Sequence, residues 1–142
     1  MKAVNTIKIQ FPSKSINEAF ARSAISSFAA QMDPTLEEIA DLKTAVSEAV
    51  TNCIVHAYQD TIGTITITGS IYENNVLKIV IADKGIGIEN IEKAMQPMFT
   101  TGGPERAGLG FAVMESFTDK IKVFSRIGKG TRITMTKQMG TR

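Results

Sequence analysis

Apolar and polar residues alternate in several short stretches of the chain, and this spacing predicts β-strands with one buried face. Near the N-terminus, Ile7, Ile9 and Phe11 alternate with polar residues. Further strands are predicted for the stretches 64–71, 76–82, 121–123 and 133–135. An Asn-Asn pair at 74–75 is typical of a hairpin turn, and residues 127–130 join the last two strands. We expect the tail after residue 137 to be frayed.

The segment after the first strand has the three-and-four spacing of an amphipathic helix. Phe20, Ala24 and Phe28 form its predicted apolar stripe. Ser15 followed by Glu18 has the pattern of a capping box at its start. We expect this helix to run to about residue 32. Its other side carries small residues and one arginine, so it is either a solvated face or a surface that receives a partner.

A second, longer helix is predicted to start at an Asp-Pro pair, residues 33–34, or at a second capping box formed by Thr35 and Glu38. Its buried stripe is predicted to extend to about residue 57 and to consist of Leu36, Ile39, Leu42, Val46, Ala49, Val50, Cys53 and Ile54.

Three polar residues of this helix, Glu48, Asn52 and His56, fall one turn apart along the flank of the buried stripe. Side chains in this position can point into a pocket. The alternative is that Glu48 and Asn52 are simply exposed helix residues. We interpret His56 as a structural or pocket-edge residue.

The composition is that of an ordinary globular protein. The 142 residues are 43% apolar and 21% charged, and the formal net charge is only +2. We therefore expect a single domain, residues 1–142, that does not bind nucleic acid through a basic stripe. No stretch approaches the ~20 apolar residues of a membrane span, and the N-terminus lacks the apolar segment of a signal peptide, so we expect a cytoplasmic protein. The single cysteine, Cys53, is interpreted as a small core residue.

The stretch Asp83-Lys84-Gly85-Ile86-Gly87-Ile88 directly follows the apolar run 76–82. It places a carboxylate at the end of a buried strand, followed by two glycines that allow close approach of another molecule. A carboxylate in this position can accept a hydrogen bond from an amino group on a flat heterocycle. The alternative is an ordinary exit from a strand into a turn.

The segment 99–110 is rich in glycine and threonine and has too few apolar residues to form an element, which is typical of a mobile lid. A helix containing Phe111 and Phe117 is predicted to follow it. A glycine-rich loop that runs into a helix N-terminus exposes backbone N–H groups, and these can hold an anion.

Four patterns occur in a fixed order: Glu48-x-x-x-Asn52 on a helix, Asp83-x-Gly85-x-Gly87 after a strand, Gly108-x-Gly110 before a helix, and Gly130-Thr131 opening a strand. Together they resemble the ATP-binding superfamily of gyrase B, the Hsp90 chaperones, histidine kinases and MutL, over nearly the whole chain. Within it, the glutamate of the helix motif and the runs 47–52 and 96–101 resemble the small serine kinases that act as anti-sigma factors. The resemblance implies a Bergerat-type α+β two-layer sandwich, a mixed, mainly antiparallel sheet covered on one face by helices.

The resemblance also assigns roles in binding the base of ATP or ADP. Asp83 would read the adenine amino group, helped by the hydroxyl of Thr131. Gly85 and Gly87 would admit the base.

At the phosphates, the resemblance assigns Asn52 to Mg²⁺ through its side-chain oxygen. Glu48 would orient or deprotonate the acceptor hydroxyl. Further contacts to the nucleotide are expected from Thr100, Thr101, Arg106, Gly108 and Gly110. Arg106 has two other interpretations, a partner contact or a plain lid charge.

As partners, the resemblance implies a sporulation sigma factor, an anti-anti-sigma protein that is phosphorylated on serine, and a second copy in a homodimer. The first helix is the candidate contact surface, with Arg22 as the residue to test. The alternatives are a kinase of the general stress response, a nucleotide-gated module that holds a sigma factor without efficient kinase activity, and an ATPase that works by lid closure.

Overall fold

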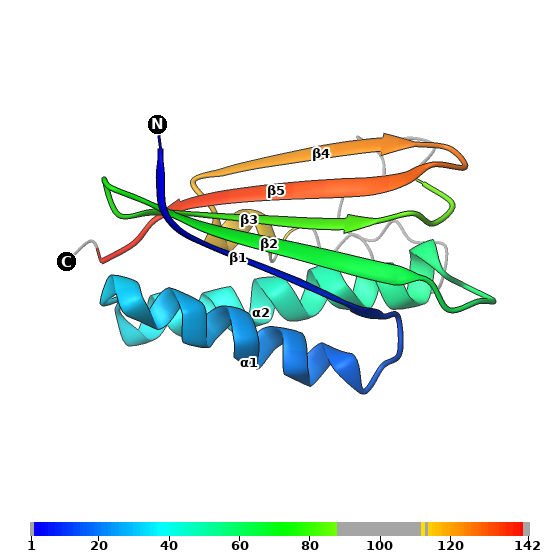
Figure 1. Ribbon diagram of the computed structural model, residues 1–142, viewed down its shortest axis with the longest axis horizontal. Helices are drawn as coiled ribbons and strands as arrows, with labels where there is room; N and C mark the ends of the chain where they lie inside the picture. Colours follow the sequence, from blue (N-terminus) through cyan, green and yellow to red (C-terminus); the bar gives the residue numbers. More distant parts are fainter. Residues whose placement is uncertain (1, 88–111, 113, 141–142) are drawn as a thin grey trace.

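The protein consists of a layer of helices packed on one face of a β-sheet (Figure 1). The computed structural model describes residues 2–87, 112 and 114–140. The strands are β1 (Ala3–Pro12), β2 (Thr64–Tyr72), β3 (Val76–Asp83), β4 (Lys120–Arg126) and β5 (Gly130–Gln138). Their order in the sheet is β1-β2-β3-β5-β4, and each of these neighbouring pairs is antiparallel. The predicted α+β sandwich with a mainly antiparallel sheet is confirmed.

Two long helices lie side by side against the sheet (Figure 1). They are α1 (Asn17–Ala29), which ends in the 3₁₀ turn η1 (Ala30–Met32), and α2 (Leu36–Asn52), which continues as the π-helical segment η2 (Cys53–Ala57). Residues 112 and 114–117 are also helical. None of the helices described is both long and apolar enough to cross a membrane.

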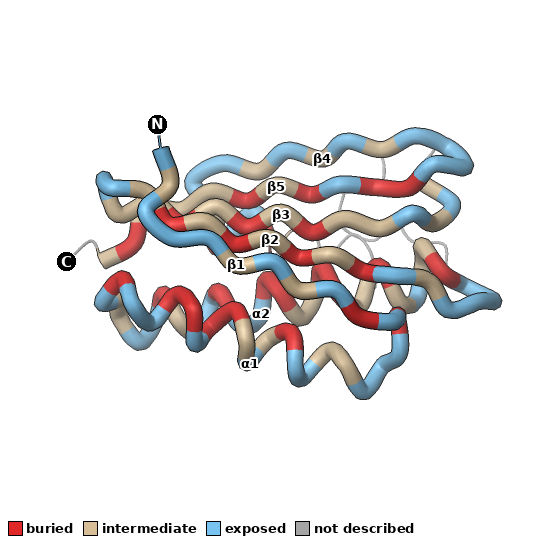
Figure 2. Tube along the Cα trace, in the orientation of Figure 1, coloured by how far each residue is buried: buried red, intermediate tan, exposed pale blue. Residues whose placement is uncertain are grey.

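The core lies between the helices and the inward face of the sheet, where buried positions alternate along the strands (Figure 2). Ile65 and Ile67 of β2 and Leu77 of β3 are 0% exposed, as are Leu42 and Val46 of α2. Burial of side chains of this size contributes about 1.5–3 kcal/mol each. The predicted strand alternation and most of the predicted α2 stripe are therefore confirmed.

The buried face of α1 differs from the predicted one. Phe20 was expected in the core but is 55% exposed, whereas the buried stripe runs through Ala21, Ile25, Phe28 and Ala29. The two stripes are neighbours on the helix and share Phe28, so apolar spacing did not separate them. The observed stripe includes two alanines, Ala21 and Ala29, that are both 0% exposed.

The capping box at the start of α2 is confirmed. The Glu38 N–H donates to Thr35 Oγ1 at 3.1 Å, and the Thr35 N–H donates to Glu38 Oε1 at 2.8 Å. The box predicted at Ser15 is wrong, because Ile16 occupies the N-cap of α1 and no side chain caps that end. Ser15 instead accepts the Glu18 N–H through its main-chain oxygen at 3.2 Å.

The helix start predicted at the Asp-Pro pair is also wrong. Asp33 has a left-handed backbone with φ 53°, and α2 begins only at Leu36. Leu36 was predicted in the buried stripe but is 92% exposed, because it lies in the first turn, beyond the edge of the core.

The tail after residue 137 is fixed as far as Gly140, contrary to the frayed end that we predicted. Met139 is 1% exposed, and its N–H donates to the Asn75 carbonyl at 3.0 Å. The Gly140 N–H donates to Glu38 Oε1 at 3.0 Å. These bonds attach the end of β5 to the β2–β3 turn and to the start of α2.

Candidate functional site

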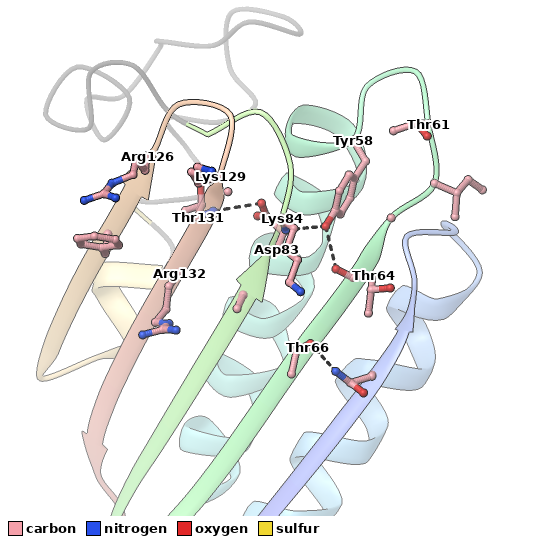
Figure 3. A pocket seen from close by; sticks show the side chains of 16 residues that line it. Tyr58, Thr61, Thr64, Thr66, Asp83, Lys84, Arg126, Lys129, Thr131 and Arg132 are labelled. Atoms are coloured by element: carbon pink, nitrogen blue, oxygen red, sulfur yellow. Dashed lines mark hydrogen bonds between the residues drawn. The ribbon is translucent and has the colours of Figure 1, made fainter.

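Asp83 is the last residue of β3, and its carboxylate faces the helix layer. It follows Ile79 and Ile81 at the two-residue spacing of the inward side of the strand. Its Oδ1 accepts the backbone N–H of Gly85 at 2.9 Å. It also accepts the backbone N–H of Thr131 at 3.2 Å (Figure 3). Both lone pairs of Oδ1 are therefore occupied from within the chain.

Oδ2 of the same carboxylate has a different environment. Its described donor is the thiol of Cys53, with Sγ at 3.4 Å. A thiol is a weak donor, so Oδ2 keeps acceptor capacity for an outside N–H. Burial raises the pKa of the Cys53 thiol well above its ordinary value, and the nearby carboxylate raises it further, so the thiol stays protonated and donating at neutral pH.

The carboxyl group of Asp83 has a pKa raised above its ordinary value, chiefly because of burial. The hydrogen bonds from Gly85, Cys53 and Thr131 stabilise the carboxylate and oppose this shift. The group thus combines partial desolvation with a fixed orientation, and a fixed acceptor of this kind can discriminate between ligands.

Thr131 lies beside Asp83 because the two residues are partners in the β3–β5 register. Its side chain is 8% exposed, and its Oγ1 is 2.8 Å from the hydroxyl oxygen of Ser125 on β4. Gly130, the residue before it, has φ +115°, and a Cβ there would collide with the Asp83 carbonyl. Glycine at 130 therefore allows β5 to approach the end of β3.

The loop after Asp83 is held against the end of α2. The Ile86 N–H donates to the Ala57 carbonyl at 3.2 Å, and a side chain at Gly85 would collide with Ala57. Tyr58 holds the start of this loop near β2. Its hydroxyl accepts the Lys84 N–H at 2.6 Å and donates to the Thr64 carbonyl at 2.9 Å (Figure 3). Gly85, one of the two glycines predicted in this loop, thus allows the loop to pack closely against Ala57.

Gly87 adopts φ +82°, a conformation that favours glycine. A Cβ on it would lie 2.5 Å from the Arg126 carbonyl. The loop therefore also lies close to the end of β4.

Glu48 and Asn52 lie one turn apart on α2 and are both half-buried, so they are not the exposed helix residues of the alternative interpretation. Asn52 Oδ1 and Nδ2 are buried and have no hydrogen-bond partner among the described residues. A buried amide without partners costs about 1–3 kcal/mol. Such an amide is the kind of group that a ligand or a hydrated cation satisfies.

The helix changes its winding directly after Asn52. In η2 the Tyr58 N–H donates to the Cys53 carbonyl at 3.1 Å, five residues back. π-Helical segments are rare and occur frequently at functional sites. This segment carries Cys53, the thiol that reaches Asp83, and His56, which is half-buried.

Sequence reasoning missed two residues of this site. Cys53 is the core residue that was predicted, at 3% exposed, but it also donates to Asp83. Tyr58, which fixes the loop, was not singled out. The signal for Cys53 was its position next to Asn52 on the stripe that faces the sheet.

Several predicted site residues lie outside the described residues, namely Thr100, Thr101, Arg106, Gly108 and Gly110. Arg22 lies elsewhere, on α1. Its guanidinium is 3.7 Å from Glu18 Oε1, and the same carboxylate oxygen accepts the hydroxyl of Ser47 on α2. Arg22 is therefore not brought together with Asp83 or Asn52.

Residues 11–137 match the histidine kinase-like ATPase domain. Over 141 residues the chain is 57% identical to the anti-sigma F factor of Caldanaerobacter subterraneus subsp. tengcongensis, with 99% of this chain and 98% of that protein covered. The chain belongs to the anti-sigma F factor branch of this ATPase family. The anti-sigma F factor of Clostridium acetobutylicum is 55% identical over 135 residues, with 94% of each chain covered.

Solved structures with low sequence identity share the fold. The RsbU and RsbW domains of Rv1364c from Mycobacterium tuberculosis superpose with a TM-score of 0.70 at 17% identity, covering 96% of this chain and 33% of that chain. Full-length ShkA in complex with AMPPNP gives a TM-score of 0.60 at 17% identity, covering 94% and 32%. These solved proteins therefore share the fold of a helix layer on an antiparallel sheet.

Proposed function

We propose that this protein is an anti-sigma factor that is also an ATP-dependent protein serine kinase. It binds and inhibits a sporulation sigma factor, and it phosphorylates a serine of the anti-anti-sigma antagonist. The observation that carries the proposal is the buried amide of Asn52, one turn from Glu48, which has no hydrogen-bond partner among the described residues. The chain is also 57% identical to an anti-sigma F factor.

The base of the nucleotide is read by Asp83. Its Oδ2 accepts the amino group of adenine, while Oδ1 stays bonded to the N–H groups of Gly85 and Thr131. The Thr131 hydroxyl assists, and Gly85 and Gly87 form the wall beside the base. This arrangement favours adenine over guanine, which presents a carbonyl oxygen where adenine presents its amino group.

A hydrated Mg²⁺ fits the same site. No cluster of three or more His, Cys, Asp or Glu side chains that could hold a metal occurs in the described part of the chain. Mg²⁺ keeps several waters and shares phosphate oxygens, so one protein oxygen, Asn52 Oδ1, is sufficient. When bound, the cation supplies neutralisation of charge on the phosphates.

Glu48 acts on the acceptor. One turn from Asn52, its carboxylate orients the serine hydroxyl of the partner and takes up its proton as phosphoryl transfer proceeds. Thr100, Thr101, Arg106, Gly108 and Gly110 hold the phosphates in this proposal. Partners contact α1 at Arg22, and the protein functions as a homodimer.

The test is to incubate the protein with γ-labelled ATP and Mg²⁺, with and without a candidate anti-anti-sigma protein, and to follow both the label and the retained sigma factor. We expect label on a serine of the antagonist and a loss of about 10²–10⁴ in rate for Glu48→Gln. Glu37→Gln, an exposed carboxylate on the same helix, is the matched control and should keep the wild-type rate.

Equal rates for Glu48→Gln and wild type would remove the role given to Glu48. Nucleotide-dependent retention of the sigma factor without label transfer would instead identify a gated binding module. Transfer only to an antagonist of the general stress sigma factor would identify the stress-response alternative.

A further inference from the structure

The sheet has a second face, opposite the helices, that the proposed function does not use. The register aligns its outward residues in rows across the strands. One row is Gln10, Thr66, Ala82, Arg132 and Phe124, the next is Lys8, Thr68, Val80, Thr134 and Lys122, and the third is Thr6, Ser70, Lys78, Thr136 and Lys120. At a strand spacing of about 4.8 Å, each row is about 19 Å wide.

Charges on this face have one sign. Its outward positions carry six cations, which are Lys8, Lys78, Lys120, Lys122, Arg126 and Arg132. No outward strand position carries a carboxylate, because the one acidic residue in the five described strands is Asp83, and it faces the helices. The net charge of +2 for the whole chain does not reveal that these cations lie together on one face.

The helix layer has the opposite balance. Together α1 and α2 carry five carboxylates and two cations. Ion pairs join Arg22 to Glu18 and Lys137 to Asp119, but within residues 2–87, 112 and 114–140 none joins the six cations of the sheet face to an acid. The positive field of this face is therefore uncompensated by the described chain.

One end of the face is hollowed. A cavity of about 930 Å³ lies over the ends of the strands and is lined by Lys84, Phe124, Arg126, Lys129 and Arg132, among others (Figure 3). The Phe124 ring is 63% exposed at its wall, and Ile62 on the other side is 57% exposed. The hollow thus offers cations together with apolar surface.

We propose that this cationic sheet face docks an acidic segment of a partner protein, with an apolar side chain of that segment seated beside Phe124. A second copy of the same face is disfavoured, because like charges would meet across the interface. The exposed apolar side chains of Phe124 and Ile62 beside the cations favour a peptide, which carries apolar side chains as well as carboxylates, over a nucleic acid. The hollow at the end of this face is also lined by Asp83 and Thr131, so a segment seated there lies next to the base end of the proposed nucleotide site.

The test uses a fluorescein-labelled peptide of glutamates interrupted by one phenylalanine, followed by fluorescence anisotropy at increasing salt. We expect salt-sensitive binding that weakens about tenfold or more in Lys122→Glu/Arg132→Glu. The matched control, Lys14→Glu/Lys43→Glu, reverses two exposed cations away from the face and should bind within about twofold of wild type. Lys122→Gln/Arg132→Gln, with its unfolding midpoint measured, excludes misfolding as the cause and should show a smaller loss.

Four results would overturn the proposal. The first is an equal loss of binding in the control variant, and the second is no binding of the peptide by the wild type. The third is tighter binding of a DNA oligonucleotide than of the acidic peptide, lost in the face variant, which would identify a nucleic-acid surface. The fourth is a wild-type dimer that dissociates on reversal of Lys122 and Arg132, as measured by sedimentation, which would identify a contact between copies.

Discussion

The two ends of the proposed nucleotide site differ in how their polar groups are held. At the end assigned to the base, the Asp83 carboxylate accepts hydrogen bonds from Gly85, Thr131 and Cys53. At the end assigned to the phosphates, the buried amide of Asn52 has no partner among the described residues. The first group is oriented by hydrogen bonds within the described chain, whereas the second has no partner there and remains available to a ligand.

This difference separates the group assigned to recognition of the base from the group assigned to the phosphates. An acceptor that is fixed before binding selects its ligand at little cost in ordering, which is the usual advantage of preorganisation. An unsatisfied amide is a cost in the free protein that a bound nucleotide and its cation would remove. We therefore expect opposite effects on the stability of the free protein when the two ends are mutated, and losses of affinity for different parts of the nucleotide.

The largest effect in the nucleotide-free protein is expected for Asp83→Ala. The N–H groups of Gly85 and Thr131 lose their acceptor, so the free energy of unfolding should fall by about 1–3 kcal/mol. ATP affinity should also fall, by about tenfold or more, because the acceptor for the base is gone. Urea unfolding and calorimetric titration measure the two effects. Unchanged stability would mean that these hydrogen bonds do not hold the base end.

Asn52→Ala is expected to have the opposite effect on the stability of the free protein. Removing an unsatisfied buried amide should leave the free energy of unfolding unchanged or raise it by up to about 1 kcal/mol without nucleotide. The affinity for Mg²⁺·ATP should fall, while the affinity for adenosine, which lacks phosphates, should stay constant. A clear loss of stability in the free protein would contradict the contrast between the two ends.

A smaller effect is expected at Cys53, whose thiol is the weakest of the three donors to Asp83. Cys53→Ala should weaken adenosine binding by about 0.5 kcal/mol, or twofold to threefold, because one bond that orients the carboxylate is lost. Cys53→Ser restores a donor of similar size and serves as the control in the same titration. If both variants bind adenosine as the wild type does, Cys53 is a core residue only.

The smallest expected effect is a change in the free energy of unfolding with pH. Because the pKa of Asp83 is raised in the folded protein, its contribution to stability is fully present below the unfolded-chain pKa, about 3.9, and is lost as the pH rises through the folded pKa. We therefore compare the free energies of unfolding of the wild type and of Asp83→Asn. The wild-type value minus the Asp83→Asn value should fall as the pH rises above the unfolded-chain pKa. Urea unfolding of both proteins in steps of pH measures the difference, and a difference that rises with pH would reverse the sign of the shift.

Much of this architecture follows from the sequence, because alternation and caps are local. The β2–β3 hairpin and the capping box of Thr35 and Glu38 are where their patterns predict them. Asp83 and Thr131 lie far apart in the chain, yet each was recognisable from its own motif, and the β3–β5 register brings them together.

The remainder depends on packing between elements. The buried face of α1 was misassigned because two neighbouring stripes are both apolar, and only packing in the folded protein selects the one with Ala21 and Ala29. The Cys53 thiol reaches Asp83 at the point where the helix becomes π-helical, and no spacing rule for a regular helix predicts that change. The positive charge of the outward sheet face could not be predicted for the same reason, because its six cations come together only after the strands are paired.

The most direct test of the account is to follow the Asn52 side-chain amide and the backbone amides of Gly85 and Thr131 by nuclear magnetic resonance during two titrations. Adenosine alone should shift the Gly85 and Thr131 signals and leave the Asn52 side chain unchanged, because it fills only the base end. Mg²⁺·ATP should shift all three. An Asn52 side chain that responds fully to adenosine, or that never responds to Mg²⁺·ATP, would contradict the division of the site into a preformed end and an end completed by its ligand.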